Sequence, residues 1–293
     1  MAGLLLAVPN LSEGRDLEKL ERLERSVGRA RVLDVHTDPD HHRSVFTLVG
    51  DDEGLVRSLV AGIERAAELI DLRVHDGIHP RVGAADVVPI VPLAAGEMPR
   101  AVEVAREVGS RVGAELGLPV FLYGESGNGR RPVFFRHGGP EELQRRVDAG
   151  ELQPDFGPDR LHPTAGAVLV GARSLLVAFN LELATDDLEQ AREIAAAVRG
   201  SSGGMVGVQA LGLLLPHAGV VQVSLNIVDV GQAALADVVA RVRAEAALRG
   251  VEVRQGELVG LIPESAAAAP AVLALDALPG DRILERRVRE LTG

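Results

Sequence analysis

Short apolar runs alternate with longer segments of helical period along this chain, and that alternation constrains its fold more than any other feature. From Asp52 to Leu69 the apolar residues recur every three or four positions, which predicts a helix with one buried face. Met98–Leu116 has the same period and ends before Gly117, as helices commonly do. Val120–Tyr123, which follows, is short and apolar and predicts a strand. Such alternation is typical of layered folds in which helices pack on β-sheets.

The second half of the chain repeats this order of elements. We expect strands over 167–170, 175–180, 206–215 and 220–227, with helices over 188–198 and 235–246. A strand, helix, strand, strand, helix order thus occurs in both halves, which predicts an α+β fold of two similar subdomains related by duplication.

The boundary between the subdomains is expected in the stretch Gly150–Pro163. Its prolines exclude both a helix interior and a central strand. We therefore expect an N-terminal subdomain of residues 1–160 and a C-terminal subdomain of residues 161–293.

Composition excludes several classes of function. The net charge of −11 comes from 31 basic and 42 acidic residues, and a surface of that sign repels nucleic acid and anionic lipid. Aromatic residues make up only 2% of the chain, so base-stacking platforms for single-stranded nucleic acid are not expected either. The absence of cysteine excludes disulfides, thiolate nucleophiles and thiolate metal sites.

No segment of the sequence predicts a targeting signal or a membrane span. The apolar run Leu4–Val8 is too short for a signal peptide and has no basic leader, so it reads as a strand. No apolar run approaches the roughly 20 residues that cross a bilayer. A cytoplasmic protein is the expectation.

Histidine and aspartate are concentrated in the segment VHTDPDHHRS, which begins at Val35. Oxygen and nitrogen ligands of this kind are what a divalent metal site would require. The alternative is a turn, made by Asp38, Pro39 and Asp40, between strands over 32–36 and 44–49. Because no HExxH spacing places two histidines on one helix face, we expect no metal.

A second histidine cluster, HDGIHPRVGAAD from His75, has the residue types of a catalytic site. Pro80 favours an extended His79, and Gly77 and Gly83 permit close approach of the backbone. His79 is a candidate general base and acid, which Asp86 would orient, while Arg81 would bind a carboxylate. The alternative is a loop histidine beside a surface ion pair.

Other catalytic and nucleotide motifs find little support. No serine lies in a GxSxG turn, and the glycine-rich stretches GESGNG and SSGG match neither a phosphate-binding loop nor a GxGxxG fingerprint. Nucleotide cofactors are therefore not expected.

Taken together, the motifs resemble the formiminotransferase family. The matching segments appear in the family's order and span Ala7 to Pro263: VPNLSEGR, DPDHHRSVFTLVG, HDGIHPRVGAADVVPIVPL, VFLYGE, PDFGP, GARSLLVAFNLEL, QVSLNIVD and ELVGLIP. The resemblance implies two α/β-sandwich subdomains whose mixed sheets face one another with helices outside, associated as a homodimer. Some relatives continue into a fused cyclodeaminase, which these 293 residues are not expected to include.

The resemblance also implies an activity, transfer of a formimidoyl group from N-formimidoyl-L-glutamate to tetrahydrofolate with release of L-glutamate, as in histidine degradation. His79 occupies the family's catalytic histidine position, with Arg81 and Asp86 beside it. The family's folate-contacting stretch maps onto Gly157, Pro158, Asp159, Arg160, Leu161, His162, Pro163, Thr164, Ala165 and Gly166. Thr164 and Ala165 stand where animal relatives have a Ser-Trp pair, which removes a possible stacking partner.

Two other functions are compatible with these residues. A related folate-dependent enzyme would move a formyl group with the same histidine, since an amidine and an amide are nearly isosteric. A catalytically silent relative would keep the fold and bind folate without transferring a group, and the presence of His79, Arg81 and Asp86 argues against it.

Overall fold

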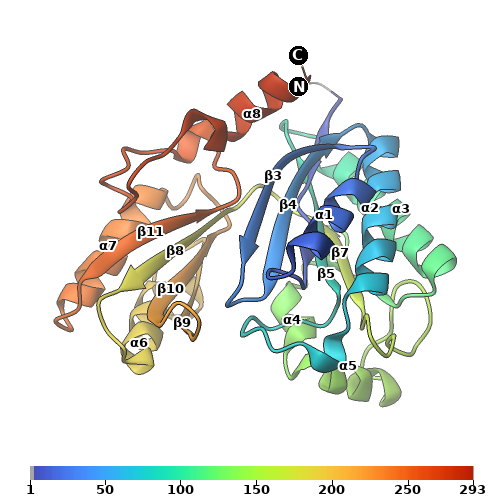
Figure 1. The fold of residues 1–293 in the computed structure, drawn as a ribbon, viewed down its shortest axis with the longest axis horizontal. Helices are drawn as coiled ribbons and strands as arrows, with labels where there is room; N and C mark the ends of the chain where they lie inside the picture. The colour runs from blue at the N-terminus through green and yellow to red at the C-terminus, as the bar shows by residue number, and fades with distance from the viewer. Residues whose placement is uncertain (1–2, 293) are drawn as a thin grey trace. The chain divides into compact units, whose positions relative to one another are not determined.

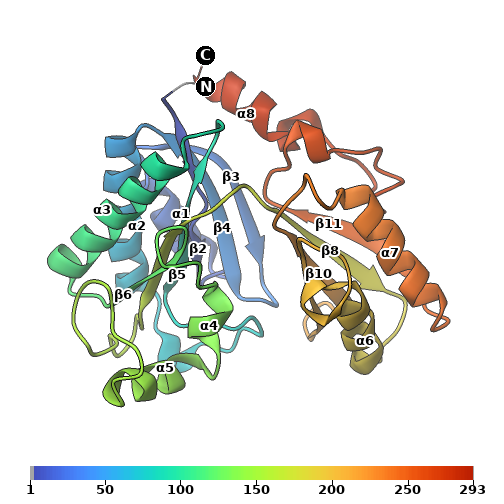
Figure 2. The ribbon, with the colours of Figure 1, turned by 180° about the vertical axis from the view of Figure 1, so that it is seen from behind.

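The polypeptide forms two compact units, one ending at Arg173 and the other beginning at Ser174. The computed structural model describes residues 3–292 (Figures 1 and 2). Each unit contains its own β-sheet and its own hydrophobic core. The α+β class expected from the sequence is confirmed.

The first unit is built on a seven-stranded sheet. Its strands are β1 (Leu5–Ala7), β2 (Asn10–Leu11), β3 (Arg31–Asp38), β4 (Arg43–Gly50), β5 (Ala85–Pro92), β6 (Val120–Gly124) and β7 (Val168–Ala172). Both β1 and β2 pair with β4 on one side and β5 on the other, so they form one strand interrupted at Val8 and Pro9. β7 pairs in parallel with β5 and β6.

Helices cover both faces of this sheet. Three long helices share one core with the sheet: α1 (Leu17–Ser26), α2 (Asp52–Leu69) and α3 (Met98–Leu116). Two other helices, α4 (Pro132–Arg136) and α5 (Gly139–Asp148), bury Phe135 and Leu143 in a separate core with Phe121 and Leu169 (Figure 1). α2 and α3 have the bounds that the apolar period predicted, because the side chains on that period are the buried ones.

The second unit is a four-stranded antiparallel sheet with two helices on one face. Its elements are β8 (Val177–Leu183), α6 (Leu188–Val198), β9 (Val208–Leu215), β10 (Val220–Ile227), α7 (Leu235–Ala247) and β11 (Val253–Val259). Asp187 caps α6 by accepting a hydrogen bond from the backbone N–H of Glu189. Apolar residues of both helices pack on the sheet in one core.

The two units share a topology. In the first, β1 and β2 together, α1, β3, β4, α2 and β5 form a sheet in the order β3-β4-β1-β5. In the second, β8, α6, β9, β10, α7 and β11 form a sheet in the order β9-β10-β8-β11. Both are antiparallel βαββαβ arrangements. The element order predicted to recur therefore does recur, and the first unit extends it with α3, α4, α5 and the parallel strands β6 and β7.

The division between the units lies later in the chain than residue 160. The proline-containing stretch is irregular, as expected, but the chain beyond it returns to the first sheet as β7. Residues 161–173 therefore belong to the first unit, because the parallel pairing of β7 completes that sheet. Gly150–Pro163 lies within the first unit and is not a linker.

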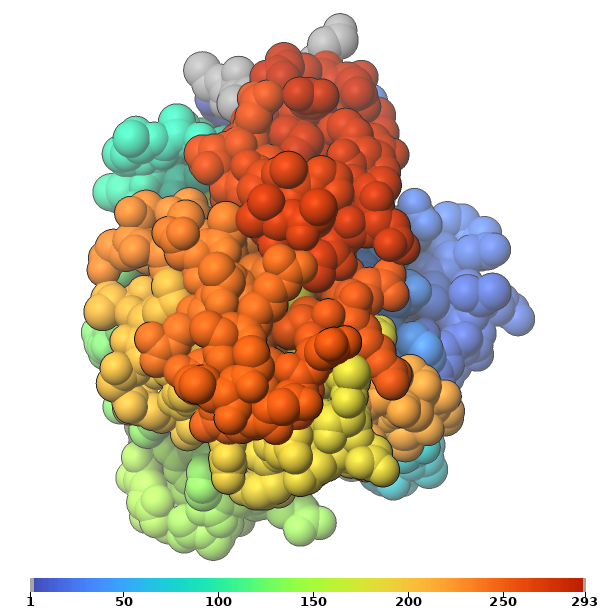
Figure 3. All heavy atoms as spheres, turned by 90° about the vertical axis from the view of Figure 1, so that its left-hand side faces the viewer, coloured from blue at the N-terminus to red at the C-terminus, as the bar shows by residue number. Residues whose placement is uncertain are grey.

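The chain after β11 forms short 3₁₀ turns, Glu264–Ala266 and Gly280–Arg282, and a last helix, α8 (Leu284–Thr292). These residues are the red surface in Figure 3, and Ile262 and Ile283 join them to the core of the second unit. Two further 3₁₀ turns are η1 (Leu72–Val74) and η2 (Gly200–Ser202). Among residues 3–292, no helix combines the length and apolar character that crossing a membrane requires.

Candidate active site

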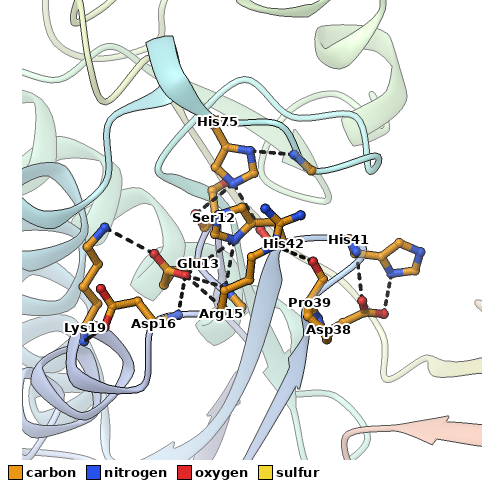
Figure 4. Close-up of polar contacts among 12 residues, drawn as sticks. Ser12, Glu13, Arg15, Asp16, Lys19, Asp38, Pro39, His41, His42 and His75 are labelled. Atoms are coloured by element: carbon orange, nitrogen blue, oxygen red, sulfur yellow. Dashed lines mark hydrogen bonds and ion pairs between the residues drawn. The ribbon is translucent and has the colours of Figure 1, made fainter. Parts of the chain in front are cut away.

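Three of the motifs singled out in the sequence meet at one end of the first sheet (Figure 4). They are residues 12–15 after β2, residues 38–43 between β3 and β4, and residues 75–81 after η1. Arg15 joins all three, because its Nε donates to Pro39 O at 2.7 Å and its Nη1 lies 2.6 Å from Asp76 Oδ1. Motifs far apart in sequence thus form one cluster.

Glu13 anchors the first motif with a buried carboxylate. Its Oε1 accepts hydrogen bonds from the backbone N–H groups of Gly14, Arg15 and Asp16 at 2.9–3.0 Å, just before α1. Burial alone would raise the pKa of Glu13, but these hydrogen bonds and the charges of His42 and Lys19 lower it on balance. A stable carboxylate therefore fixes the chain that enters α1.

His42 and His75 form a stacked pair, with ring centroids 4.2 Å apart. His75 Nδ1 accepts a hydrogen bond from the N–H of Gly77. Its Nε2 lies 3.1 Å from Ser12 O, 3.2 Å from His42 O and 2.9 Å from Arg81 Nη1. Burial, then the positive charge of Arg81, lowers the pKa of His75 to about 4. His75 is therefore neutral at pH 7 and ties the first motif to the second.

This neutral histidine predicts a loss of stability in mild acid. Between the folded pKa of about 4 and the unfolded value of 6.5, His75 takes up a proton only in the unfolded chain, so stability falls as pH falls through this window. His75→Gln keeps an N–H donor but cannot titrate. Between pH 7 and pH 5 we expect its free energy of unfolding to fall by about 1–2 kcal/mol less than that of the original protein. Urea denaturation at the two pH values measures this difference.

The matched control is His137→Gln, which changes an exposed histidine. That variant should keep the pH dependence of the original protein. An equal pH dependence in all three proteins would mean that His75 titrates normally when folded.

Arg81 is committed to the backbone of the cluster. Its Nε donates to His79 O at 3.1 Å, its Nη1 to His42 O at 3.0 Å and its Nη2 to His41 O at 2.7 Å. A Cβ atom on Gly77 would lie 2.5 Å from Nη2, which explains the glycine there. The close approach expected at Gly77 is therefore confirmed. Three of the five N–H groups of Arg81 thus bind backbone carbonyls, and Nη1 also lies 2.9 Å from His75 Nε2, so its binding of a substrate carboxylate stays a prediction.

His79 is partly exposed and presents a basic ring nitrogen. Its Nδ1 lies 2.8 Å from Pro80 O, so Nδ1 carries the proton and Nε2 does not. Arg43 Nη1 lies 2.7 Å from Nε2 and 3.1 Å from Nδ1. Burial, then the charges of Arg43 and Arg136, lowers the pKa of His79 well below 6.5. His79 is therefore a neutral imidazole at pH 7, the state that a general base requires.

Asp86 does not orient His79, which corrects the expectation from the sequence. Asp86 lies in β5, where its Oδ1 accepts from the N–H of Val82 at 2.8 Å and its Oδ2 forms an ion pair with Arg136. The groups that contact the ring of His79 are Arg43, Pro80 O and, edge to face at 5.8 Å, His41.

The DPDHH segment forms the turn that was one of its two interpretations. Asp38 Oδ1 accepts from the N–H groups of Asp40 and His41, and its Oδ2 lies 2.9 Å from His41 Nδ1. Within the part of the chain that the structure describes, no group of three or more His, Cys, Asp or Glu side chains could hold a metal ion.

We therefore predict that the activity of the protein survives exhaustive chelation, because Asp38 and His41 bind each other. The assay compares turnover before and after dialysis against a strong chelator. If chelation abolished turnover and a divalent cation restored it, the DPDHH segment would be a metal site.

The predicted folate-contacting stretch divides into two parts. Residues 162–166 lie beside the chain that follows His79, since Ala84 N donates to Ala165 O, and Ala167 N donates to Val82 O, each at 2.9 Å. A Cβ on Gly83 would lie 1.9 Å from Ala167 O, so the close approach expected there is also confirmed. Residues 157–160 are exposed, and Gln144 of α5 binds Asp159 O and Leu161 N.

Sequence reasoning missed two arginines of this cluster. Arg43 begins β4 directly after His42, and Arg136 ends α4. The signal for Arg43 was its place in the DPDHHR motif. Arg136 follows no motif, and only the buried carboxylate of Asp86 implies a cation near it.

The sequence comparisons agree with the motifs. The family model for the N-terminal subdomain of the formiminotransferase domain matches residues 4–173, and the model for the formiminotransferase domain matches residues 178–273. A glutamate formimidoyltransferase of Thermoplasma acidophilum is 40% identical over 98% of each chain, and one of Streptococcus pyogenes is 38% identical over 91% of each.

A rat formimidoyltransferase-cyclodeaminase is 35% identical over 94% of this chain but only 53% of its own length. The chain therefore spans about half of that bifunctional relative. The two family models together match both units, and the two glutamate formimidoyltransferases are 38–40% identical over nearly the whole chain. The chain therefore belongs to the formiminotransferase family.

Proposed function

We propose that this protein is a glutamate formimidoyltransferase, which moves the formimidoyl group of N-formimidoyl-L-glutamate to tetrahydrofolate and releases L-glutamate. The observation that carries the proposal is the near full-length match to two proteins of that name. A neutral, partly exposed His79 supports it chemically, since the chain a few residues after it pairs with the predicted folate stretch.

His79 has the properties of a base and then an acid in this reaction. Its Nε2 takes the proton from N5 of tetrahydrofolate as that nitrogen bonds to the amidine carbon. The same nitrogen then gives a proton to the glutamate nitrogen as the bond between that nitrogen and carbon breaks. Because the pKa of His79 is low, its protonated form is a good acid for the second step. Protons and bonds balance without another reactant.

Arg81 and Asp86 act in this proposal by holding other groups. Arg81 fixes the backbone on both sides of the site through the carbonyls of His41, His42 and His79. Asp86 holds the side chain of Arg136 by an ion pair. It also accepts a hydrogen bond from the N–H of Val82, where the segment that pairs with the folate stretch begins. We propose that the exposed residues 157–160 and the adjoining chain to Gly166 contact tetrahydrofolate.

The test mixes the purified protein with tetrahydrofolate and either N-formimidoyl-L-glutamate or N-formyl-L-glutamate. Release of L-glutamate from the formimidoyl donor alone supports the proposal. Preferential use of the formyl donor would make the protein a formyltransferase. Folate binding without use of either donor would identify a catalytically silent relative.

The family resemblance also predicts a homodimer in the cytoplasm, with the two sheets of each chain facing one another. With a chain of 30.9 kDa, sedimentation should report a particle of twice that mass. Neither a nucleic acid nor a membrane partner is expected from the acidic composition.

A further inference from the structure

Positive charge is concentrated around His79. Arg43, Arg81 and Arg136 lie close enough that the charge of Arg136 lowers the pKa values of the other two, after burial, to about 9 for Arg43 and about 10 for Arg81. Asp86 opposes this effect on both. Asp38 also acts on Arg43, and Asp76 also acts on Arg81. These three carboxylates pair with other groups, Asp86 with Arg136, Asp38 with His41 and Asp76 with Arg15. Among residues 3–292, Arg43 and Arg81 therefore have no carboxylate as an ion-pair partner, which leaves an excess of positive charge in a partly desolvated place.

Two of these arginines keep hydrogen-bonding capacity. Arg43 Nε and Arg136 Nε are both buried, and neither has a hydrogen-bond partner among residues 3–292. Arg43 uses Nη1 on His79, and Arg136 uses Nη2 on Asp86. Buried N–H groups without partners are rare in folded proteins, and where they occur beside excess positive charge they fit an anionic ligand.

We infer that Arg43 and Arg136 bind the α-carboxylate of the donor's glutamate, directly beside His79. This inference rests on the proposed function, because it assumes that the donor's glutamate nitrogen meets His79. It assigns to these two arginines the carboxylate binding that the sequence suggested for Arg81, whose guanidinium is committed to backbone carbonyls.

Covalent geometry favours this carboxylate over others. In the donor, the α-carboxylate carbon is two bonds from the nitrogen that His79 must protonate, so its oxygens lie about 3 Å from that nitrogen. Arg43, which touches His79 Nε2, can therefore reach the α-carboxylate in a pose that brings the donor nitrogen to Nε2 from the side of Arg43. The glutamate of tetrahydrofolate is separated from N5 by the aminobenzoyl group and lies much farther from the reacting atoms.

The contact between Arg43 and the donor's carboxylate also explains how His79 becomes available to accept a proton. In the structure Arg43 Nη1 donates to Nε2, the nitrogen that has to accept a proton. A carboxylate is a stronger acceptor for guanidinium than a neutral imidazole. Donor binding therefore draws Arg43 away from Nε2 and exposes the electron pair when the reactants are in place.

The experiment compares N-formimidoyl-L-glutamate with the same donor carrying an α-amide. We expect the original protein to prefer the α-carboxylate donor by about 10- to 100-fold in kcat/KM, the range for a charge-assisted hydrogen-bonded contact. Arg43→Gln should reduce that preference to less than about threefold, and Arg136→Lys, which keeps a charge for Asp86, should reduce it partly. The control is Arg111→Gln, which removes an exposed arginine of α3 paired with Glu115 and should keep the full preference.

A parallel arm compares tetrahydrofolate with tetrahydropteroate, which lacks the glutamate. If Arg43→Gln abolishes this preference and not the first, the arginines bind the folate carboxylate and the donor assignment is wrong. If Arg43→Gln changes neither preference, no substrate carboxylate binds there. Arg43→Lys replaces Arg43→Gln if the latter does not fold, with a smaller loss of preference expected.

A binding measurement separates failure of this inference from failure of the proposed function. Calorimetric titration with L-glutamate and with its α-amide needs no turnover. If neither donor reacts but Arg43→Gln still removes a preference for L-glutamate, the carboxylate site stands and the proposed reaction does not. Equal binding of the two ligands by the original protein would overturn the inference.

Discussion

Replacing His79 by alanine is expected to lower kcat by roughly two to four powers of ten, the usual contribution of a positioned general base and acid. The expectation rests on the state of the ring: burial and the charges of Arg43 and Arg136 keep it neutral at pH 7, and Nε2, which Arg43 Nη1 contacts, is the ring nitrogen without a proton. Steady-state turnover of the formimidoyl donor, with tetrahydrofolate saturating, measures the loss. In the original protein the acidic limb of kcat should lie below pH 6.5, because protonation of His79 requires acid.

Folate binding should survive this substitution. The ring of His79 contacts Arg43, Pro80 O and, edge to face, His41, whereas the folate stretch is held by backbone pairing with residues 82–84. The dissociation constant for tetrahydrofolate should change by less than about threefold, a fraction of 1 kcal/mol. Unfolding of the variant, or loss of folate binding, would give His79 a structural role instead.

Helical period and short apolar runs predicted most of the fold, because burial of one face decides those elements. α2, α3 and β10 have the bounds that the pattern gave. The pattern failed for β5, a central strand whose apolar run contains Pro89 and Pro92 and was read only as part of a motif. It also failed for α4, whose five residues are too few to show a period.

Only the locally determined part of the site was predicted from the sequence. Local rules place glycines at close approaches, and Gly77 and Gly83 fill that role. Which groups pair with a charged side chain depends on the tertiary structure. Asp86 was predicted to orient His79 because both lie in one motif, but the carboxylate of Asp86 in β5 pairs with Arg136 of α4, fifty residues later in the chain. Sequence proximity says little about which of several nearby cations a buried carboxylate meets.

Arg81→Lys should be among the most damaging conservative substitutions in the chain. The guanidinium reaches three carbonyls, those of His41, His42 and His79, which belong to two separate loops. A lysine ammonium is a single point donor and cannot occupy the same three positions. At least one buried carbonyl would lose its partner, and each such loss costs about 1–3 kcal/mol.

We therefore expect Arg81→Lys to lower the free energy of unfolding by roughly 2–4 kcal/mol in urea denaturation. Because the same carbonyls hold Arg43 and His79 in position, kcat should fall more than about tenfold at a temperature where the variant is still folded, with the KM for tetrahydrofolate little changed. Arg73→Lys is the matched control, since Arg73 is exposed and pairs only with the neighbouring Asp71, and it should change neither quantity appreciably. If Arg81→Lys were as stable and as active as Arg73→Lys, the carbonyls of the two loops would have to be satisfied without the guanidinium, and Arg81 would not be what holds His79 in place.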